Sequence, residues 1–176
     1  SEGVIASHTI KLFGIGESTM EAQLREQMNA MSNPTLAPYA KEGECELRVT
    51  AKAATDEEAQ ALLQPTVEQV KKLFGAKVYG VDVPSLEYVI IQALKDRGLT
   101  LGTAESCTGG LMAKRLTDIP GASQAFKGGI VSYTNEVKHN VLRVPEYRLE
   151  RLADKDGNVV VGGVVSAEVA AAMAEG

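Results

Sequence analysis

Tryptophan is absent from this 176-residue sequence, and all aromatic residues together make up only 5% of it. A hydrophobic core must therefore be assembled from Val, Leu, Ile, Ala and Met, and the 44% hydrophobic content is normal for a globular protein. Long apolar runs are also missing. None approaches the roughly 18 residues that a membrane-spanning helix needs, and the chain does not open with a signal-peptide pattern. We therefore expect a cytoplasmic protein without a membrane partner.

Cysteine and histidine are scarce, with two residues of each. Cys45 and Cys107 lie far apart in the sequence, which is typical of reduced thiols in a cytosolic protein. His8 and His139 are isolated, and no Cys/His cluster has the spacing of a metal site. The sequence therefore predicts no disulfide and no metal, and it gives no sign of another cofactor.

An excess of basic residues is missing as well. The formal net charge is −5 and the pI is about 5.2, which argues against a protein that holds nucleic acid on a basic face. A small anionic ligand stays compatible with this charge, because the N-terminus of a helix binds phosphate without any net positive charge.

Residues 1–82 are predicted to form a small α+β module in the order strand, helix, strand, helix, strand. The second strand shows the clearest pattern, because apolar and polar residues alternate along it. Its apolar side is Cys45, Leu47, Val49 and Ala51. The expected strands are residues 4–13, 44–53 and 77–82, and the expected helices are residues 18–31 and 55–74.

Capping signals define these two helices. Ser18 is the expected N-cap of the first, with Glu21 as its capping-box partner, and Asn33-Pro34 and Pro38 are expected to break the chain after it. Thr55 and Gly75 are the expected caps of the second helix. Pro65 lies inside that helix and permits a kink or break there.

Residues 83–176 are predicted to form an α/β layered domain, because helices and strands alternate along them. Asn135 is the expected N-cap of one of these helices and Ser166 of the last. That last helix runs to the final residue, so we expect the domain to continue beyond Gly176. The expected helices are 86–96, 106–117, 123–126, 135–142, 145–152 and 166–176, and the expected strands are 99–104, 129–134 and 159–161.

The strongest chemical signal is the run Thr103-Ala-Glu-Ser-Cys-Thr-Gly-Gly110. A strand ends here at Ser106, and a helix begins through two glycines, Gly109 and Gly110. Free backbone N–H groups at such a point stabilise a phosphate or a developing oxyanion. The alternative is an ordinary helix N-cap at Ser106 or Thr108.

A second signal is Ser132-Tyr-Thr-Asn-Glu-Val-Lys138, where another strand passes into a helix. If the two strands are neighbours, Tyr133 and Lys138 can face the same cleft as Ser106. A serine nucleophile needs a base, and a buried lysine can serve as one. Composition alone favours a solvated helix lysine at 138. The nearby acids Glu105 and Glu136 either orient a ligand or pair with a helix dipole.

These two motifs, together with Gly163-Val-Val-Ser166-Ala-Glu-Val, strongly resemble the C-terminal domain of the CinA family. That family is known as a nicotinamide mononucleotide deamidase. The first half resembles the family's KH-like middle domain through Phe13-Gly-Ile-Gly-Glu-Ser, Asn33-Pro-Thr-Leu-Ala-Pro and Lys41-Glu-Gly-Glu. The resemblance implies an α/β protein: a small α+β KH-like module at 1–82, then an incomplete CinA C-terminal domain at 83–176. The family's N-terminal molybdopterin-binding-like domain is not in this sequence.

The resemblance also implies the chemistry. The carboxamide of nicotinamide mononucleotide would be hydrolysed to nicotinic acid mononucleotide and ammonia, without a cofactor. Ser106 would be the nucleophile and Lys138 the general base, with Tyr133 assisting through a hydrogen bond. The implied substrate-binding residues are Glu105, Thr108, Gly109, Gly110 and Asn135.

Other functions remain open at this point. The chain is alternatively a non-catalytic assembly or nucleotide-binding module of a multidomain CinA protein. Nucleic acid is not an expected partner, because a KH domain uses a Gly-X-X-Gly loop with basic flanks. The first half has Gly14-Ile-Gly16 instead and is net acidic. We expect a small nucleotide substrate and a homodimer.

Overall fold

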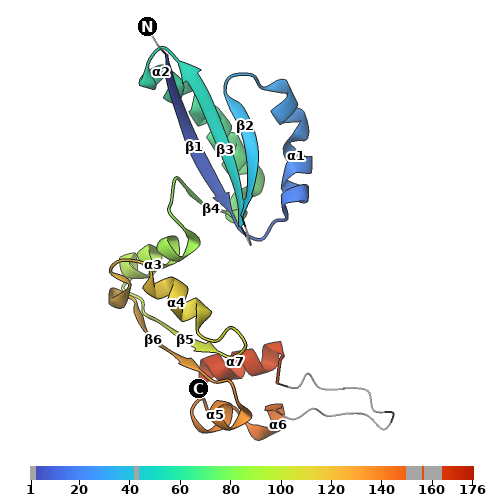
Figure 1. Cartoon of the computed structure of the whole chain (residues 1–176), viewed down its shortest axis with the longest axis vertical. Helices are drawn as coiled ribbons and strands as arrows, with labels where there is room; N and C mark the ends of the chain where they lie inside the picture. The colour runs from blue at the N-terminus through green and yellow to red at the C-terminus, as the bar shows by residue number, and fades with distance from the viewer. Residues whose placement is uncertain (1–2, 42–43, 150–155, 157–163) are drawn as a thin grey trace. The chain divides into compact units, whose positions relative to one another are not determined.

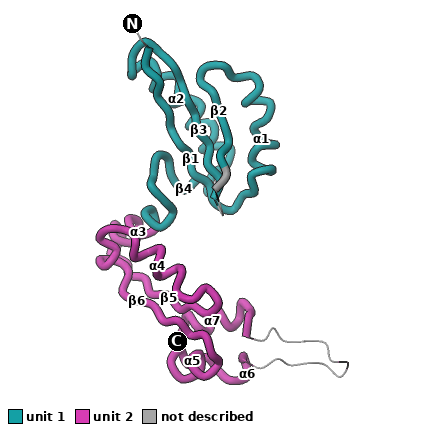
Figure 2. Tube along the Cα trace, viewed as in Figure 1, with its two compact units in different colours: residues 1–89 teal, residues 90–176 magenta. Residues whose placement is uncertain are grey.

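The computed structural model describes residues 3–41, 44–149, 156 and 164–176. The chain divides into two compact units, Ser1–Val89 and Ile90–Gly176, which Figure 2 colours separately. Both units combine helices and strands (Figure 1), so the expected α/β class is confirmed. The sequence-based boundary lies at residues 82–83, and the division between the units falls inside helix α3, Leu86–Asp96.

Unit 1 is built on a four-stranded antiparallel sheet in the order β2-β3-β1-β4. Helix α2 contacts β1 and β3, and helix α1 contacts β2. Buried side chains of both helices and of the sheet form one core. The elements of this unit are β1 Val4–Leu12, α1 Glu17–Ala30, β2 Thr35–Lys41, β3 Glu44–Ala53, α2 Asp56–Phe74, η1 Gly75–Lys77 and β4 Val78–Val81.

Several predictions for unit 1 are confirmed. β3 has the predicted bounds, and its four apolar residues are at most 6% exposed. Helix α2 starts after Thr55, whose side chain accepts a hydrogen bond from the amide of Glu58, and Gly75 ends it. The helix is continuous through Pro65.

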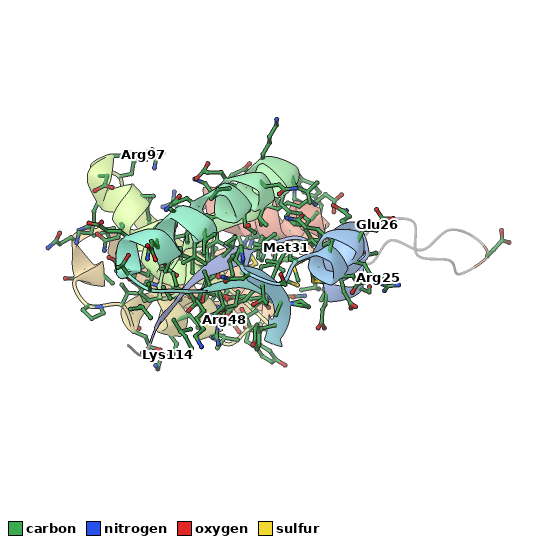
Figure 3. All side chains as sticks on the ribbon, turned by 90° about the horizontal axis from the view of Figure 1, so that it is seen from above. Arg25, Glu26, Met31, Arg48, Arg97 and Lys114 are labelled. Atoms are coloured by element: carbon green, nitrogen blue, oxygen red, sulfur yellow. The ribbon has the colours of Figure 1, made fainter. Side chains whose placement is uncertain are left out.

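Two expectations for unit 1 are wrong. Strand β2 was not predicted, because a proline such as Pro38 is typical of a break in regular secondary structure. β2 lies at the edge of the sheet, where a residue without an N–H group is tolerated. In addition, α1 begins after Gly16, which makes no side-chain cap, so Ser18 lies within the helix and forms no capping box. The outer side of α1 carries charged residues such as Arg25 and Glu26 (Figure 3).

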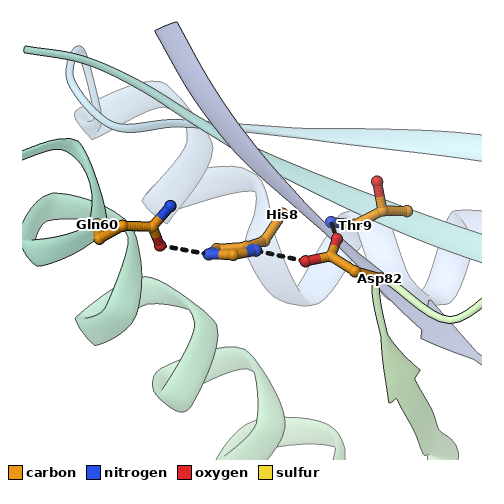
Figure 4. A network of polar contacts seen from close by, with 4 residues as sticks. All are labelled: His8, Thr9, Gln60 and Asp82. Atoms are coloured by element: carbon orange, nitrogen blue, oxygen red, sulfur yellow. Dashed lines mark hydrogen bonds and ion pairs between the residues drawn. The ribbon is translucent and has the colours of Figure 1, made fainter. Parts of the chain in front are cut away.

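A polar network in unit 1 joins β1, α2 and Asp82, the residue that follows β4 (Figure 4). The ring of His8 on β1 contacts Asp82 Oδ2 at 2.5 Å through Nδ1 and Gln60 Oε1 at 2.8 Å through Nε2. The amide of Thr9 donates to Asp82 Oδ1. Both ring nitrogens therefore face acceptor oxygens, an arrangement that suits the doubly protonated ring. The hydrogen bond that His8 donates to Asp82 raises the pKa of His8 above its usual 6.5. Burial lowers this pKa, and the hydrogen bond to Gln60 raises it further.

We expect unit 1 to lose stability as the pH rises through the raised pKa of His8. Because the folded state raises the pKa of His8, its contribution is complete below about pH 6.5 and is lost as the pH passes through the raised value. Urea unfolding followed by circular dichroism at about pH 6 and about pH 8.5 measures the change. His8→Gln should flatten this dependence. Equal slopes for the wild type and the variant would contradict the prediction.

Unit 2 contains a two-stranded parallel sheet, β5 paired with β6. Helix α4 connects the two strands and packs on both, and α7 contacts β5. Ile91, Leu116 and Phe126 belong to one buried cluster, and Leu142, Val169 and Met173 to another. Its elements after α3 are β5 Leu101–Glu105, α4 Leu111–Thr117, η2 Ala122–Gln124, β6 Phe126–Val131, α5 Asn135–Asn140, α6 Glu146–Leu149 and α7 Ala167–Glu175.

The capping prediction for α7 is confirmed, since Ser166 Oγ accepts a hydrogen bond from the amide of Val169. The predicted strand at residues 159–161, the end of the predicted helix at 150–152 and Gly163 of the third motif lie outside the described residues. Within the described part of the chain, no helix combines the length and the apolar character needed to cross a membrane. The two cysteines are unpaired, with Cys45 buried and Cys107 exposed.

Candidate active site

The candidate nucleophile Ser106 lies directly after the carboxyl end of β5. In the parallel pair Glu105 is opposite Val131, so Ser106 and Ser132 leave their strands at the same edge of the sheet. Ligands of open α/β sheets bind at this edge, outside the carboxyl ends of the strands. The two motifs singled out in the sequence therefore meet at one place.

The predicted helical start at Ser106 is wrong. Residues 106–110 form a turn, and α4 begins only at Leu111. The residue before it, Gly110, has a φ of 94°, a left-handed conformation that favours glycine, and it provides no side-chain cap. Neither Ser106 nor Thr108 is the N-cap of α4. The hydroxyl of Ser106 is consequently available for another partner.

That partner is Lys138 on α5. Its Nζ lies 2.9 Å from Ser106 Oγ, although the two residues are 32 positions apart in the sequence. Lys138 is only 1% exposed, so the interpretation of a solvated lysine is wrong. Composition could not reveal this, because α5 is a short helix whose packing turns one polar residue inward.

Two backbone carbonyl groups hold the amine of Lys138. Its Nζ donates to Ser132 O at 2.6 Å and approaches Tyr133 O at 3.4 Å. Ser132 is itself fully buried, and its amide donates to Glu105 O at 2.7 Å. The strand end that follows Glu105 and the strand end that carries Ser132 are thus joined directly, which fixes the amine toward Ser106.

The turn between Ser106 and α4 presents unused backbone donors. The amide of Gly109 donates to Ser106 O and that of Leu111 to Thr108 O. Among the described residues, nothing accepts a hydrogen bond from the amides of Cys107, Thr108 and Gly110. Donors of this kind beside a serine hydroxyl stabilise an oxyanion. These free amides belong to the turn, whereas the first amides of α4 already donate to acceptors of the chain.

The side chain of Glu105 accepts hydrogen bonds from amides in the first turn of α4. The donors are the amides of Met112 at 2.8 Å and Ala113 at 3.0 Å. Burial would raise the pKa of this carboxyl, but the two amides, with the hydroxyls of Thr108 and Thr103, bring it below its usual value. Of the two roles considered for Glu105, the structure shows the one in which the acid pairs with the N-terminus of a helix.

The remaining predicted site residues lie around this centre. The side chain of Tyr133 is 75% exposed, and its contact with Lys138 runs through its backbone carbonyl. Asn135 is the first residue of α5 and is exposed. The prediction that Asn135 caps this helix is wrong, because Thr134 accepts the hydrogen bond from the amide of Val137. Glu136 is exposed on the same helix.

Sequence reasoning missed two participants. Thr134 was discoverable, since a threonine before a helix start is a common N-cap. Ser132 was not, because it acts on Lys138 through a backbone carbonyl that every residue type possesses. In the described part of the chain, no group of three or more His, Cys, Asp or Glu side chains is arranged to hold a metal ion.

Comparison with known families covers both units. Residues 7–80 match the family described as the damage-inducible protein CinA KH domain. Residues 83–176 match the CinA C-terminal domain, which is more than half of the chain. The chain belongs to the CinA family. The Ser106–Lys138 pair thus lies in its CinA C-terminal domain, and the His8 network in its CinA KH domain apart from Asp82, which follows the matched region.

Similar proteins carry the same family name. The chain is 44% identical over its full length to a CinA-like protein of Dictyoglomus turgidum, and 46% identical over 98% of its length to one of Desulfovibrio desulfuricans. It spans about 40% of the length of these CinA relatives. A crystal structure of competence/damage inducible protein CihA from Agrobacterium tumefaciens is 40% identical, with a TM-score of 0.44 over 52% of this chain and 49% of that one.

Proposed function

We propose that this chain carries the active site of an amidohydrolase that converts nicotinamide mononucleotide to nicotinic acid mononucleotide and ammonia. The observation that supports this most directly is the 2.9 Å contact between Lys138 Nζ and Ser106 Oγ, with the lysine almost fully buried. A serine hydroxyl is a weak nucleophile unless a base takes its proton, and this amine lies within reach of that proton.

The geometry supports a two-step mechanism. Lys138 Nζ lies within hydrogen-bond distance of Ser132 O, Tyr133 O and Ser106 Oγ. In the proposed reaction the amine acts in its neutral form, with its two N–H groups directed to the carbonyls and its lone pair directed to Ser106. The lone pair takes the Ser106 proton while Oγ attacks the carboxamide carbon. The resulting oxyanion accepts hydrogen bonds from the free amides of the turn at residues 106–110.

The leaving group then departs as ammonia. The Lys138 ammonium returns its proton to the amide nitrogen as the C–N bond breaks, which leaves an ester on Ser106. Water attacks this ester, and Lys138 takes the proton of the water and gives it back to Ser106 Oγ. Nicotinic acid mononucleotide is released, and Ser106 and Lys138 have neither gained nor lost a proton over the cycle.

The direct test is to incubate the chain with nicotinamide mononucleotide and to measure both products. Ammonia and nicotinic acid mononucleotide should appear in equal amounts, at a rate proportional to the protein concentration. Because the chain spans about 40% of its relatives' length, the assay is repeated on a chain extended beyond Gly176. The absence of both products from both folded proteins would refute the proposed reaction.

A further inference from the structure

The side chain of Glu105 holds together the two ends of the turn that carries Ser106. Glu105 is the last residue of β5, and its carboxylate accepts hydrogen bonds from the amides of Met112 and Ala113 in the first turn of α4. These bonds enclose residues 106–111. The position of Ser106 is therefore set from both sides: by β5 before it, and by the anchored start of α4 after it.

The local sequence leaves this task to Glu105 alone. Gly110 precedes α4 without a capping side chain, so the amides of Met112 and Ala113 have no acceptor from a capping residue, whereas that of Leu111 donates to Thr108 O. Thr103, two residues before Glu105 on the same strand, also reaches its Oε2 at 3.5 Å. It has room to do so because β6 carries Gly129 opposite it, where any Cβ would clash with Thr103 Oγ1.

Glu105 is not placed to contact a substrate. The residue is 4% exposed, and both of its side-chain oxygens are occupied by donors of the chain itself. Its backbone carbonyl also supports Lys138, because Glu105 O accepts a hydrogen bond from Ser132 N, and Ser132 O accepts one from Lys138 Nζ. One residue thus connects the support of the nucleophile with the support of the base.

We propose that Glu105 is a positioning residue, which fixes the turn of Ser106 and its free amides by clamping the start of α4. This inference rests on the proposed function, and it replaces the substrate-binding role expected for Glu105. The ionised carboxylate, with two acceptor oxygens, is needed because the clamped groups are both N–H donors. A glutamine would turn a donor toward one of them.

Glu105→Gln in the full chain tests the proposal, with Asp118→Asn as the matched control. Asp118 follows the same helix, is exposed, and pairs with Lys114 away from the turn. We expect Glu105→Gln to lower kcat roughly 10- to 100-fold with KM unchanged, because misplaced reacting groups slow the chemistry. A raised KM at unchanged kcat would identify a substrate ligand and overturn the proposal, and so would wild-type kinetics.

A second readout does not depend on turnover. Amide hydrogen exchange of Met112 and Ala113, followed by NMR, should be faster in Glu105→Gln than in the wild type and unchanged in Asp118→Asn. Unchanged exchange would overturn the clamp. If Glu105→Gln does not fold, Glu105→Asp, which keeps the charge but shortens its reach, is measured the same way. If neither the wild-type chain nor its form extended beyond Gly176 releases ammonia, the proposed function alone is refuted, and the exchange rates then decide this inference.

Discussion

Ser106→Ala is expected to lower kcat for ammonia release by about 10⁴- to 10⁶-fold, the range seen when a serine hydrolase loses its nucleophile. The substitution deletes a single half-buried oxygen, and the amine of Lys138 keeps its two carbonyl partners. The fold should therefore remain intact. Steady-state assays together with circular dichroism measure both properties on the same sample.

Ser123→Ala is the matched control for this substitution. Ser123 lies in η2 of the same unit, is exposed, and contacts Lys127 only through its backbone carbonyl, which alanine retains. Wild-type kinetics are expected for this variant. A Ser106→Ala protein with a rate close to that of the wild type would exclude Ser106 as the nucleophile.

Lys138→Met is expected to lower kcat by about 10²- to 10⁴-fold, the usual contribution of a general base. Methionine fills most of the volume of the buried lysine stem, so the variant should leave no large cavity. It leaves Ser132 O without its donor, at a cost of about 1–3 kcal/mol in stability. Activity is therefore compared at a temperature where circular dichroism shows both proteins to be folded.

The pH dependence of the rate distinguishes a Lys138 that acts as a base from a Lys138 that only fills space in the core. If Lys138 accepts the Ser106 proton, the limb of the pH–rate profile that reports the base should disappear in Lys138→Met. Lys114→Met is the control, because Lys114 is an exposed lysine of α4. A Lys138→Met profile with the same shape as that of the wild type would remove the base role.

Much of the fold could be predicted because local signals decide it. β3 alternates apolar and polar residues, and α2 has a threonine cap, an acidic first turn and a terminal glycine. β2 could not be predicted, because the edge position that tolerates Pro38 depends on which strands pair. The start of α4 was predicted too early, because the side chain that accepts hydrogen bonds from its first turn is Glu105, which lies outside the helix.

The candidate site divides in the same way. Ser106 carries a local signature of strand, serine and glycines, which made it a candidate beside the alternative of an ordinary helix N-cap. Lys138 carries none, because its burial and its 2.9 Å contact with Ser106 result from tertiary packing. Only the family resemblance pointed to this lysine. The clamp by Glu105 was equally hidden, because an acid beside a helix start is more often an exposed partner of the helix dipole.

The parallel pairing of β5 and β6 has a consequence for when the proposed site can form during folding. Parallel strands are joined through a crossover helix, and such long-range pairing forms late and slowly during folding. The serine and the lysine meet only once Glu105 and Val131 are in register. A partly folded chain would therefore lack the proposed Ser106–Lys138 pair. The proposed reaction would begin only when the two strands have paired, and recovered turnover would report the end of refolding in this unit.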